Sequence, residues 1–143
     1  MLVAFCLCLG QETERKTELE GKWEIVERSI EGSYYTEEEI KEMLVRWLVF
    51  RGNKLIALDK DGKVKNETTF KVDPKQEPAT MDAVCQDLVA PTGMSVFQYI
   101  YKLRGDTLTV CWQVGSRAAK RPKDFNNVPG SNLEVLTLKR VKE

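Results

Sequence analysis

The feature that most constrains the fold of this sequence is an alternation between short runs of β-branched, aromatic and leucine residues and breaks of Gly, Pro, Asp or Asn. Runs of this composition, bounded by turn formers, are typical of β-strands. The predicted strands are Lys22–Ile30, Arg46–Phe50, Lys54–Leu58, Val64–Val72, Ala79–Val84, Ser95–Leu103, Thr107–Val114 and Leu133–Arg140. A chain of 143 residues without an internal repeat or linker fits one domain. The sequence therefore predicts a single all-β domain.

Three of the breaks are tight turns. Arg51–Asn53, Lys60–Gly62 and Arg104–Asp106 each contain residues that tolerate a positive φ, as antiparallel hairpins require. Eight strands suit a small closed barrel whose interior is filled by side chains or holds one small ligand. We therefore predict an eight-stranded antiparallel β-barrel over residues 17–143.

One segment has a helical pattern. In Thr36–Leu44, Thr36 and Glu39 make a capping box, and the acidic first turn complements the helix dipole. Ile40, Met43 and Leu44 share one face at i, i+3 and i+4 spacing. This predicts one helix of about two turns between the first and second predicted strands.

The last predicted strand has a mixed alternation. Leu133 and Val135 share one face, whereas Leu136, Leu138 and Arg140 share the other. Either a bulge interrupts this strand, or both of its faces are buried.

The first nine residues, MLVAFCLCL, form a short apolar run that a polar stretch follows. Since about 20 apolar residues are needed to cross a bilayer, no stable membrane span is predicted. The run resembles the apolar core of a secretory signal whose basic leading region is missing. Residues 1–16 are therefore interpreted as a truncated signal-like segment and linker, which predicts export to the periplasm or cell envelope. The alternatives are a cytoplasmic protein and an N-terminal strand or helix that packs on the core.

Four cysteines, at positions 6, 8, 85 and 111, form no Cys-x-x-Cys pair, which argues against structural zinc. If the first two leave with a signal segment, Cys85 and Cys111 remain, and in an oxidising compartment they could form a disulfide. The alternative is that both are buried free thiols.

Charge and composition exclude several functions. With 22 basic and 22 acidic residues, the chain has no electrostatic excess for nucleic-acid binding. No histidine is present, which removes His-dependent triads, imidazole metal sites and the commonest general base. Asp59 begins a calcium-like loop, but Phe70 stands at its twelfth position, where an acidic ligand is required. We predict a non-enzymatic protein with no catalytic residue, no metal and no cofactor.

Aromatic residues gather on two neighbouring predicted strands. Tyr99 and Tyr101 share a face with Leu103, and Trp112 shares a face with Leu108 and Val110. Such a cluster is ordinarily cross-strand core packing. Its functional reading is a cavity for an apolar ligand, lined by Tyr99, Tyr101 and Trp112.

The chain resembles a family, the small uncharacterised lipocalin-like domain of planctomycete bacteria. The resemblance rests on the order and spacing of pieces that run through nearly the whole chain: Leu19–Trp23, Phe50–Leu55, Phe70–Pro74, Pro78–Asp82, Tyr101–Leu108, Cys111, Arg121–Pro122, Phe125 and Val135–Arg140. It implies a lipocalin-like barrel and a binding precedent, but no established activity.

The start Gly21-Lys22-Trp23 is also similar to the G-x-W signature of lipocalins. That resemblance implies that Trp23 closes the barrel floor beneath a basic residue of the last strand, which is Arg140 or, failing that, Lys139. A guanidinium over an indole face contributes roughly 0.5 to 2 kcal/mol.

From these observations we expect a binding module for a small apolar or amphipathic ligand. A filled-core structural or interaction domain of the envelope is the alternative. A hydrolase that works without histidine is a third class, for which no residue stands out.

Overall fold

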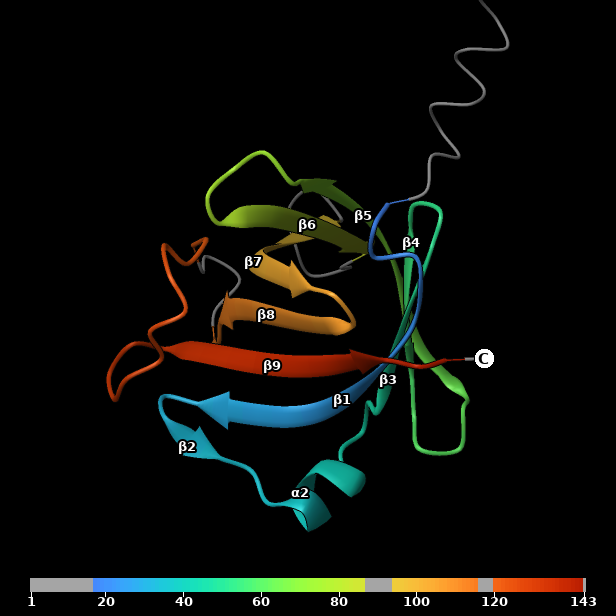
Figure 1. Cartoon of the computed structure of the whole chain (residues 1–143), viewed down its shortest axis with the longest axis horizontal. Coiled ribbons are helices and arrows are strands. Elements are labelled where there is room, and N and C mark those ends of the chain that lie inside the picture. Colours follow the sequence, from blue (N-terminus) through green and yellow to red (C-terminus); the bar gives the residue numbers. More distant parts are fainter. Residues whose placement is uncertain (1–16, 87–93, 116–119, 143) are drawn as a thin grey trace, which may run out of the picture.

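The computed structural model describes residues 17–86, 94–115 and 120–142, and within them it shows one closed antiparallel β-barrel (Figure 1). The signal-like segment predicted at residues 1–16, with Cys6 and Cys8, lies outside the described residues. The predicted all-β fold with eight barrel strands is confirmed.

The barrel strands lie where the turn pattern predicts them, each boundary within two residues. Their bounds are β1 Gly21–Ile30, β3 Trp47–Arg51, β4 Lys54–Leu58, β5 Val64–Asp73, β6 Ala79–Gln86, β7 Met94–Arg104, β8 Thr107–Gln113 and β9 Leu133–Arg140. The turn at Gly52-Asn53 joins β3 to β4 and the turn at Gly105-Asp106 joins β7 to β8, since the flanking residues pair directly. A two-residue strand that was not predicted, β2 Ser33–Tyr34, pairs with the end of β1.

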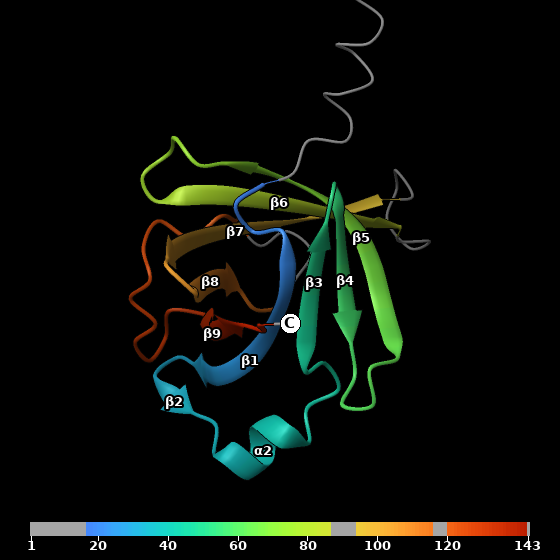
Figure 2. The same ribbon diagram turned by 45° about the vertical axis from the view of Figure 1, so that its right-hand side comes forward.

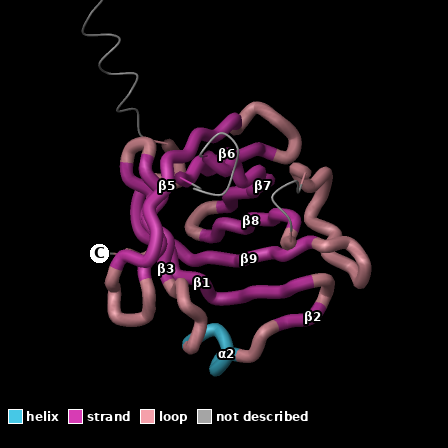
Figure 3. Tube along the Cα trace, turned by 180° about the vertical axis from the view of Figure 1, so that it is seen from behind, coloured by secondary structure: helices cyan, strands magenta, loops and turns pink. Residues whose placement is uncertain are grey.

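The ring closes because β1 pairs with two strands. Its first residues, Gly21–Glu24, pair with β3, whereas most of its length pairs with β9, beside which it lies in Figure 1. Further along, β1 curves away from β3 and pairs with β2 instead (Figure 2). Seen from behind, the short helix α2 lies at the same end of the barrel as β2 (Figure 3).

A β-bulge interrupts β1 rather than β9. Ile25 pairs with Leu138 and Glu27 with Thr137, so Val26 is an additional residue with no partner across the ladder. Residues directly opposite each other on antiparallel strands share a face. Because Leu136 and Leu138 both face the barrel interior, the bulge turns Arg28 inward together with Ile25.

The β9 strand is instead buried on both faces, the second of the two alternatives predicted for it. Its inner face carries Leu136 and Leu138, which pack in the main core. Its outer face carries Leu133 and Val135, which pack with other residues in a second cluster. Residues 120–132, which we call the strap, cover this cluster through Phe125.

The helix α2, Glu37–Lys41, is shorter than predicted. Ile40 is buried, as its spacing predicts, but Leu44 is 70% exposed, so the predicted three-residue face is wrong at that position. The reason is that the helix ends at Glu42, whose φ of −95° and ψ of 4° turn the chain away from helical geometry before Leu44.

The capping box of α2 is formed as predicted, and it gives a first test. The Glu39 amide donates to Thr36 Oγ1 over 3.1 Å, and the Thr36 amide donates to Glu39 Oε1 over 2.9 Å. Thr36→Ala should therefore lower the free energy of unfolding by about 1 kcal/mol in urea denaturation. Thr36→Ser keeps the hydroxyl and should lose much less. Equal losses in the two variants would contradict a capping role.

Candidate functional site

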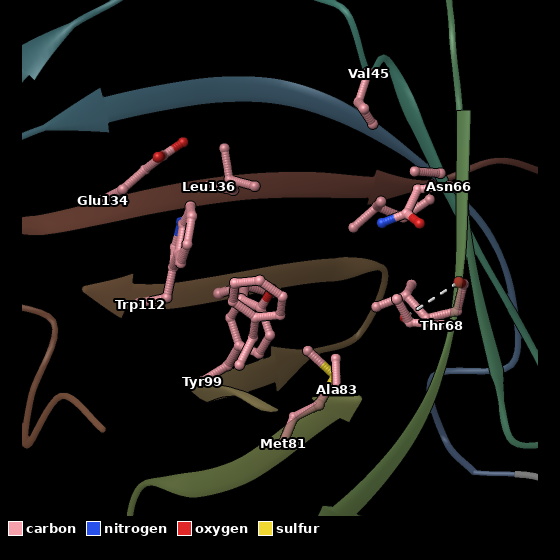
Figure 4. A pocket seen from close by; sticks show the side chains of 14 residues that line it. Val45, Asn66, Thr68, Met81, Ala83, Tyr99, Trp112, Glu134 and Leu136 are labelled. Carbon is pink, nitrogen blue, oxygen red and sulfur yellow. Dashed lines mark hydrogen bonds between the residues drawn. The ribbon is translucent and has the colours of Figure 1, made fainter. Parts of the chain in front are cut away.

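A cavity of about 260 Å³ lies inside the barrel (Figure 4). Its walls come from β3 to β9 and from Val45, which precedes β3. The lining residues are Val45, Leu48, Leu55, Ala57, Asn66, Thr68, Met81, Ala83, Phe97, Tyr99, Val110, Trp112, Glu134 and Leu136. Engineered apolar cavities of about 150 Å³ hold benzene, so this volume suits a small ligand of one or two rings.

Aromatic side chains form one wall of the cavity. Tyr99 and Trp112 line it, as predicted, with ring centroids 5.9 Å apart. Phe97 joins them, its ring edge-to-face with Trp112 at 6.2 Å. Phe97 was missed, although it precedes Tyr99 at the strand period of two that brought the two tyrosines together.

Tyr101 does not line the cavity, which corrects its predicted role. It faces inward like Tyr99, but it lies two residues further along β7, nearer the end of the barrel where Arg140 lies over Trp23. There it packs in the filled core at 5% exposure. Burial raises its pKa, and the charges of Glu18 and Asp73 raise it further. The period-two alternation of side chains predicts which residues of a strand face the barrel interior, but it does not predict at which depth along the barrel the interior is hollow.

Three polar side chains interrupt the apolar lining. Asn66 and Thr68 lie on β5, while Glu134 lies on β9 across the cavity (Figure 4). Glu134 is only 4% exposed, and its Oε2 accepts a hydrogen bond of 2.6 Å from Arg28 Nε. The Arg28 guanidinium in turn lies 4.4 Å from the centroid of the Tyr35 ring. A buried carboxylate requires such a partner, because burying an unpaired charge is costly.

The inward position of Glu134 could have been predicted from the sequence. Glu134 has the same alternation phase as Leu136 and Leu138, so a strictly alternating β9 places a charge inside the barrel. Arg28 could not be found in the same way, since it faces inward only because of the bulge at Val26.

The end of the barrel beyond this core is closed by Trp23 and Arg140. Trp23 is fully buried, and its Nε1 donates to the Leu19 carbonyl over 2.8 Å. The Arg140 guanidinium lies 4.3 Å from the Trp23 ring centroid, and its Nη1 donates to the Glu20 carbonyl over 2.8 Å. Gly21 has a φ of +123°, a conformation that side-chain-bearing residues rarely adopt. The stacking expected of Arg140 on Trp23 is thus present.

The two cysteines predicted as a disulfide lie on strands that are not neighbours. Strand β7 separates Cys85 on β6 from Cys111 on β8. Strands two apart in a sheet are about 10 Å apart, beyond the roughly 7 Å between Cα atoms that a disulfide can bridge. Cys111 is a free, fully buried thiol, as the alternative interpretation had it, whereas the side chain of Cys85 lies outside the described residues.

Burial changes the chemistry of the Cys111 thiol. Desolvation raises its pKa to about 12, and the nearby charge of Asp124 adds to the effect. A thiol nucleophile reacts as its thiolate, so Cys111 is chemically inert at neutral pH.

Two other motifs have structural roles. The Asp59 Oδ1 accepts hydrogen bonds of 2.9 Å from the amides of Asp61 and Lys63, which fixes the hairpin between β4 and β5 and lowers the pKa of Asp59. Arg121, near the start of the strap, forms an ion pair of 2.6 Å with Asp82 and donates to the Tyr99 carbonyl over 2.9 Å. Arg121 therefore fastens the strap to the outer surface of β6 and β7.

Among residues 17–86, 94–115 and 120–142, no three acidic or cysteine side chains gather as a metal site would require. Within the same ranges, none of the helices has the length and apolar character to cross a bilayer.

The comparisons with known proteins add no assignment. No family model, no curated protein and no solved structure matches this chain. The cavity and the residues around it are therefore the features from which a function can be inferred.

Proposed function

We propose that this barrel is a non-enzymatic binding module that takes a small apolar or amphipathic ligand into the cavity. The observation that carries the proposal is a hollow lined by Phe97, Tyr99 and Trp112 within a barrel whose other half is filled. Apolar pockets with a few polar groups are the usual form of small-molecule sites. The absence of histidine supports a binding rather than a catalytic role.

The lipocalin-like resemblance supports the same proposal, since it supplies a precedent for ligands held inside a barrel. Export to the periplasm or cell envelope is part of the proposal, with the apolar run Met1–Leu9 as its support.

Filling the cavity tests the proposal. Ala83 is 2% exposed and lines the cavity, so Ala83→Phe would place a ring where the ligand is expected. We expect 2-methylnaphthalene to bind the wild-type chain with a Kd of about micromolar order in titration calorimetry, and the variant to bind at least about tenfold more weakly.

The matched control is Val96→Phe, which adds the same ring at an exposed position of β7 and should leave the affinity unchanged. If the wild-type chain binds neither 2-methylnaphthalene nor any member of a lipid panel, the proposal is wrong and a structural or interaction domain replaces it.

A further inference from the structure

Glu134 distinguishes this cavity from a purely apolar one. It is the one charged side chain among the described residues that line the cavity, and it lies almost entirely out of contact with bulk water. Its Oε2 is taken by Arg28, but its Oε1 accepts no hydrogen bond within the described part of the chain. No fully buried side-chain oxygen or nitrogen in that part lacks a partner, so Oε1 must retain accessible space. Oε1 is therefore available to accept a hydrogen bond from a ligand.

Arg28 decides which kind of donor fits. Because its guanidinium lies 2.6 Å from Oε2, the charge of Glu134 is already balanced by a cation held against the Tyr35 ring. A cationic ligand bound to Oε1 would lie close to the Arg28 guanidinium, which would repel it. An anionic ligand would meet the carboxylate itself. A neutral hydroxyl or N–H group can donate to Oε1 without either cost.

The neighbourhood of Glu134 decides what the rest of the ligand is like. Trp112 lies directly opposite Glu134 in the pairing of β8 with β9, and Cβ atoms at such positions are about 5 Å apart. The Trp112 ring in turn contacts the rings of Phe97 and Tyr99. Glu134 and Trp112 lie side by side in Figure 4. A flat apolar body on the wall therefore brings a substituent at its edge within reach of the carboxylate.

We propose that the cavity selects a neutral ligand of one or two aromatic rings whose hydroxyl or N–H group donates a hydrogen bond to Glu134 Oε1. This inference rests on the proposed function, since it names the class of ligand that the same cavity takes.

Four probes of nearly equal shape test the inference: 2-naphthol, 2-methylnaphthalene, 2-naphthylmethylammonium and 2-naphthoate. Titration calorimetry of the full chain at neutral pH should show 2-naphthol binding about ten- to hundredfold more tightly than 2-methylnaphthalene, because one hydrogen bond to a charged group is gained. Both ionic probes should bind more weakly than 2-naphthol by at least about tenfold.

A double variant isolates the ion pair. Arg28→Met with Glu134→Leu replaces both charges by apolar side chains, a change that buried ion pairs commonly tolerate. In this variant 2-naphthol should lose its advantage over 2-methylnaphthalene. The matched control is Arg46→Met with Glu24→Leu, which removes an ion pair of 3.0 Å whose members do not line the cavity and should keep the advantage.

The outcomes separate this inference from the proposed function. If no probe binds and no member of the lipid panel binds either, the proposed function is wrong. If only a lipid binds, the proposed function stands and this inference is overturned. If 2-methylnaphthalene binds as tightly as 2-naphthol, the cavity is a general apolar site and only this inference is overturned. Tightest binding of either ionic probe overturns the neutral class in the same way. Since the ranking on the wild-type chain decides these outcomes, the test stands even if the double variant fails to fold.

Discussion

Trp23→Ala is expected to lower the free energy of unfolding by about 3 to 5 kcal/mol, the usual cost of truncating a buried tryptophan. Trp23 is fully buried, its Nε1 hydrogen bond holds Leu19 across the barrel floor, and its ring supports Arg140. The variant loses the packing of the ring and leaves the Leu19 carbonyl without this donor. Urea denaturation of both chains measures the difference.

Trp47→Ala is the control for this loss. Trp47 is only half-buried, and Lys22 lies over its ring at 4.6 Å, so its truncation removes a large side chain from outside the core. It should cost clearly less than Trp23→Ala. Comparable losses would mean that the barrel floor contributes no more to stability than the outer surface.

The contact between Trp23 and Arg140 can be measured separately. Arg140→Ala should cost less than Trp23→Ala, since it removes a partly exposed side chain with its hydrogen bond to the Glu20 carbonyl. In a double-mutant cycle the coupling should exceed about 0.5 kcal/mol, as expected of residues in contact. Additive losses would show that the cation over the indole ring contributes nothing to the closure.

The second large effect is expected at alkaline pH and comes from Cys111. Its pKa is about 12 in the folded chain, while an unfolded thiol titrates near 8.5. Between these values the unfolded chain has lost the proton and the folded chain has kept it. Stability from this group is therefore complete below about pH 8.5 and falls as the pH rises towards 12. The slope is about 1.4 kcal/mol per pH unit, which amounts to about 5 kcal/mol over the whole range.

Urea denaturation between neutral pH and pH 11 should show this loss in the wild-type chain and a flatter dependence in Cys111→Ala. Tyr101 contributes in the same direction, because burial raises its pKa as well, so the variant should keep part of the alkaline loss. The difference between the two curves isolates Cys111. Parallel curves would contradict a proton held by burial.

The strands could be predicted because each is bounded by local turn chemistry. Gly52 and Gly105 have positive φ values of 61° and 59° at hairpin turns, as their neighbours in the sequence indicate. The bulge in β1 could not be predicted in this way, because it exists only relative to the register of β9. Strand β9 has apolar residues on both faces because its outer face packs in a second cluster under the strap. That cluster forms through contacts between residues far apart in the sequence, so the local pattern of β9 could not reveal it.

The cavity could be predicted only in part for a similar reason. Period-two alternation brought Tyr99 and Trp112 to the inner face, where they line the hollow. The same rule included Tyr101, which lies in the filled half. Depth along the barrel axis depends on strand tilt and stagger, which no single strand's sequence contains.

The bulge at Val26 also has a consequence for how this chain can change in length. The alternation of inward and outward side chains shifts by one residue at the bulge. Ile25 is the last inward residue before the shift, and Arg28 is the first inward residue after it. Val26, at the shift itself, is part of neither alternation. A deletion at this position would join the two ladders into a regular strand while Ile25 and Arg28 still faced inward. A one-residue deletion between Gly21 and Ile25 would instead exchange inner and outer side chains over part of the strand, so relatives that differ in length within β1 are expected to carry the gap at Val26.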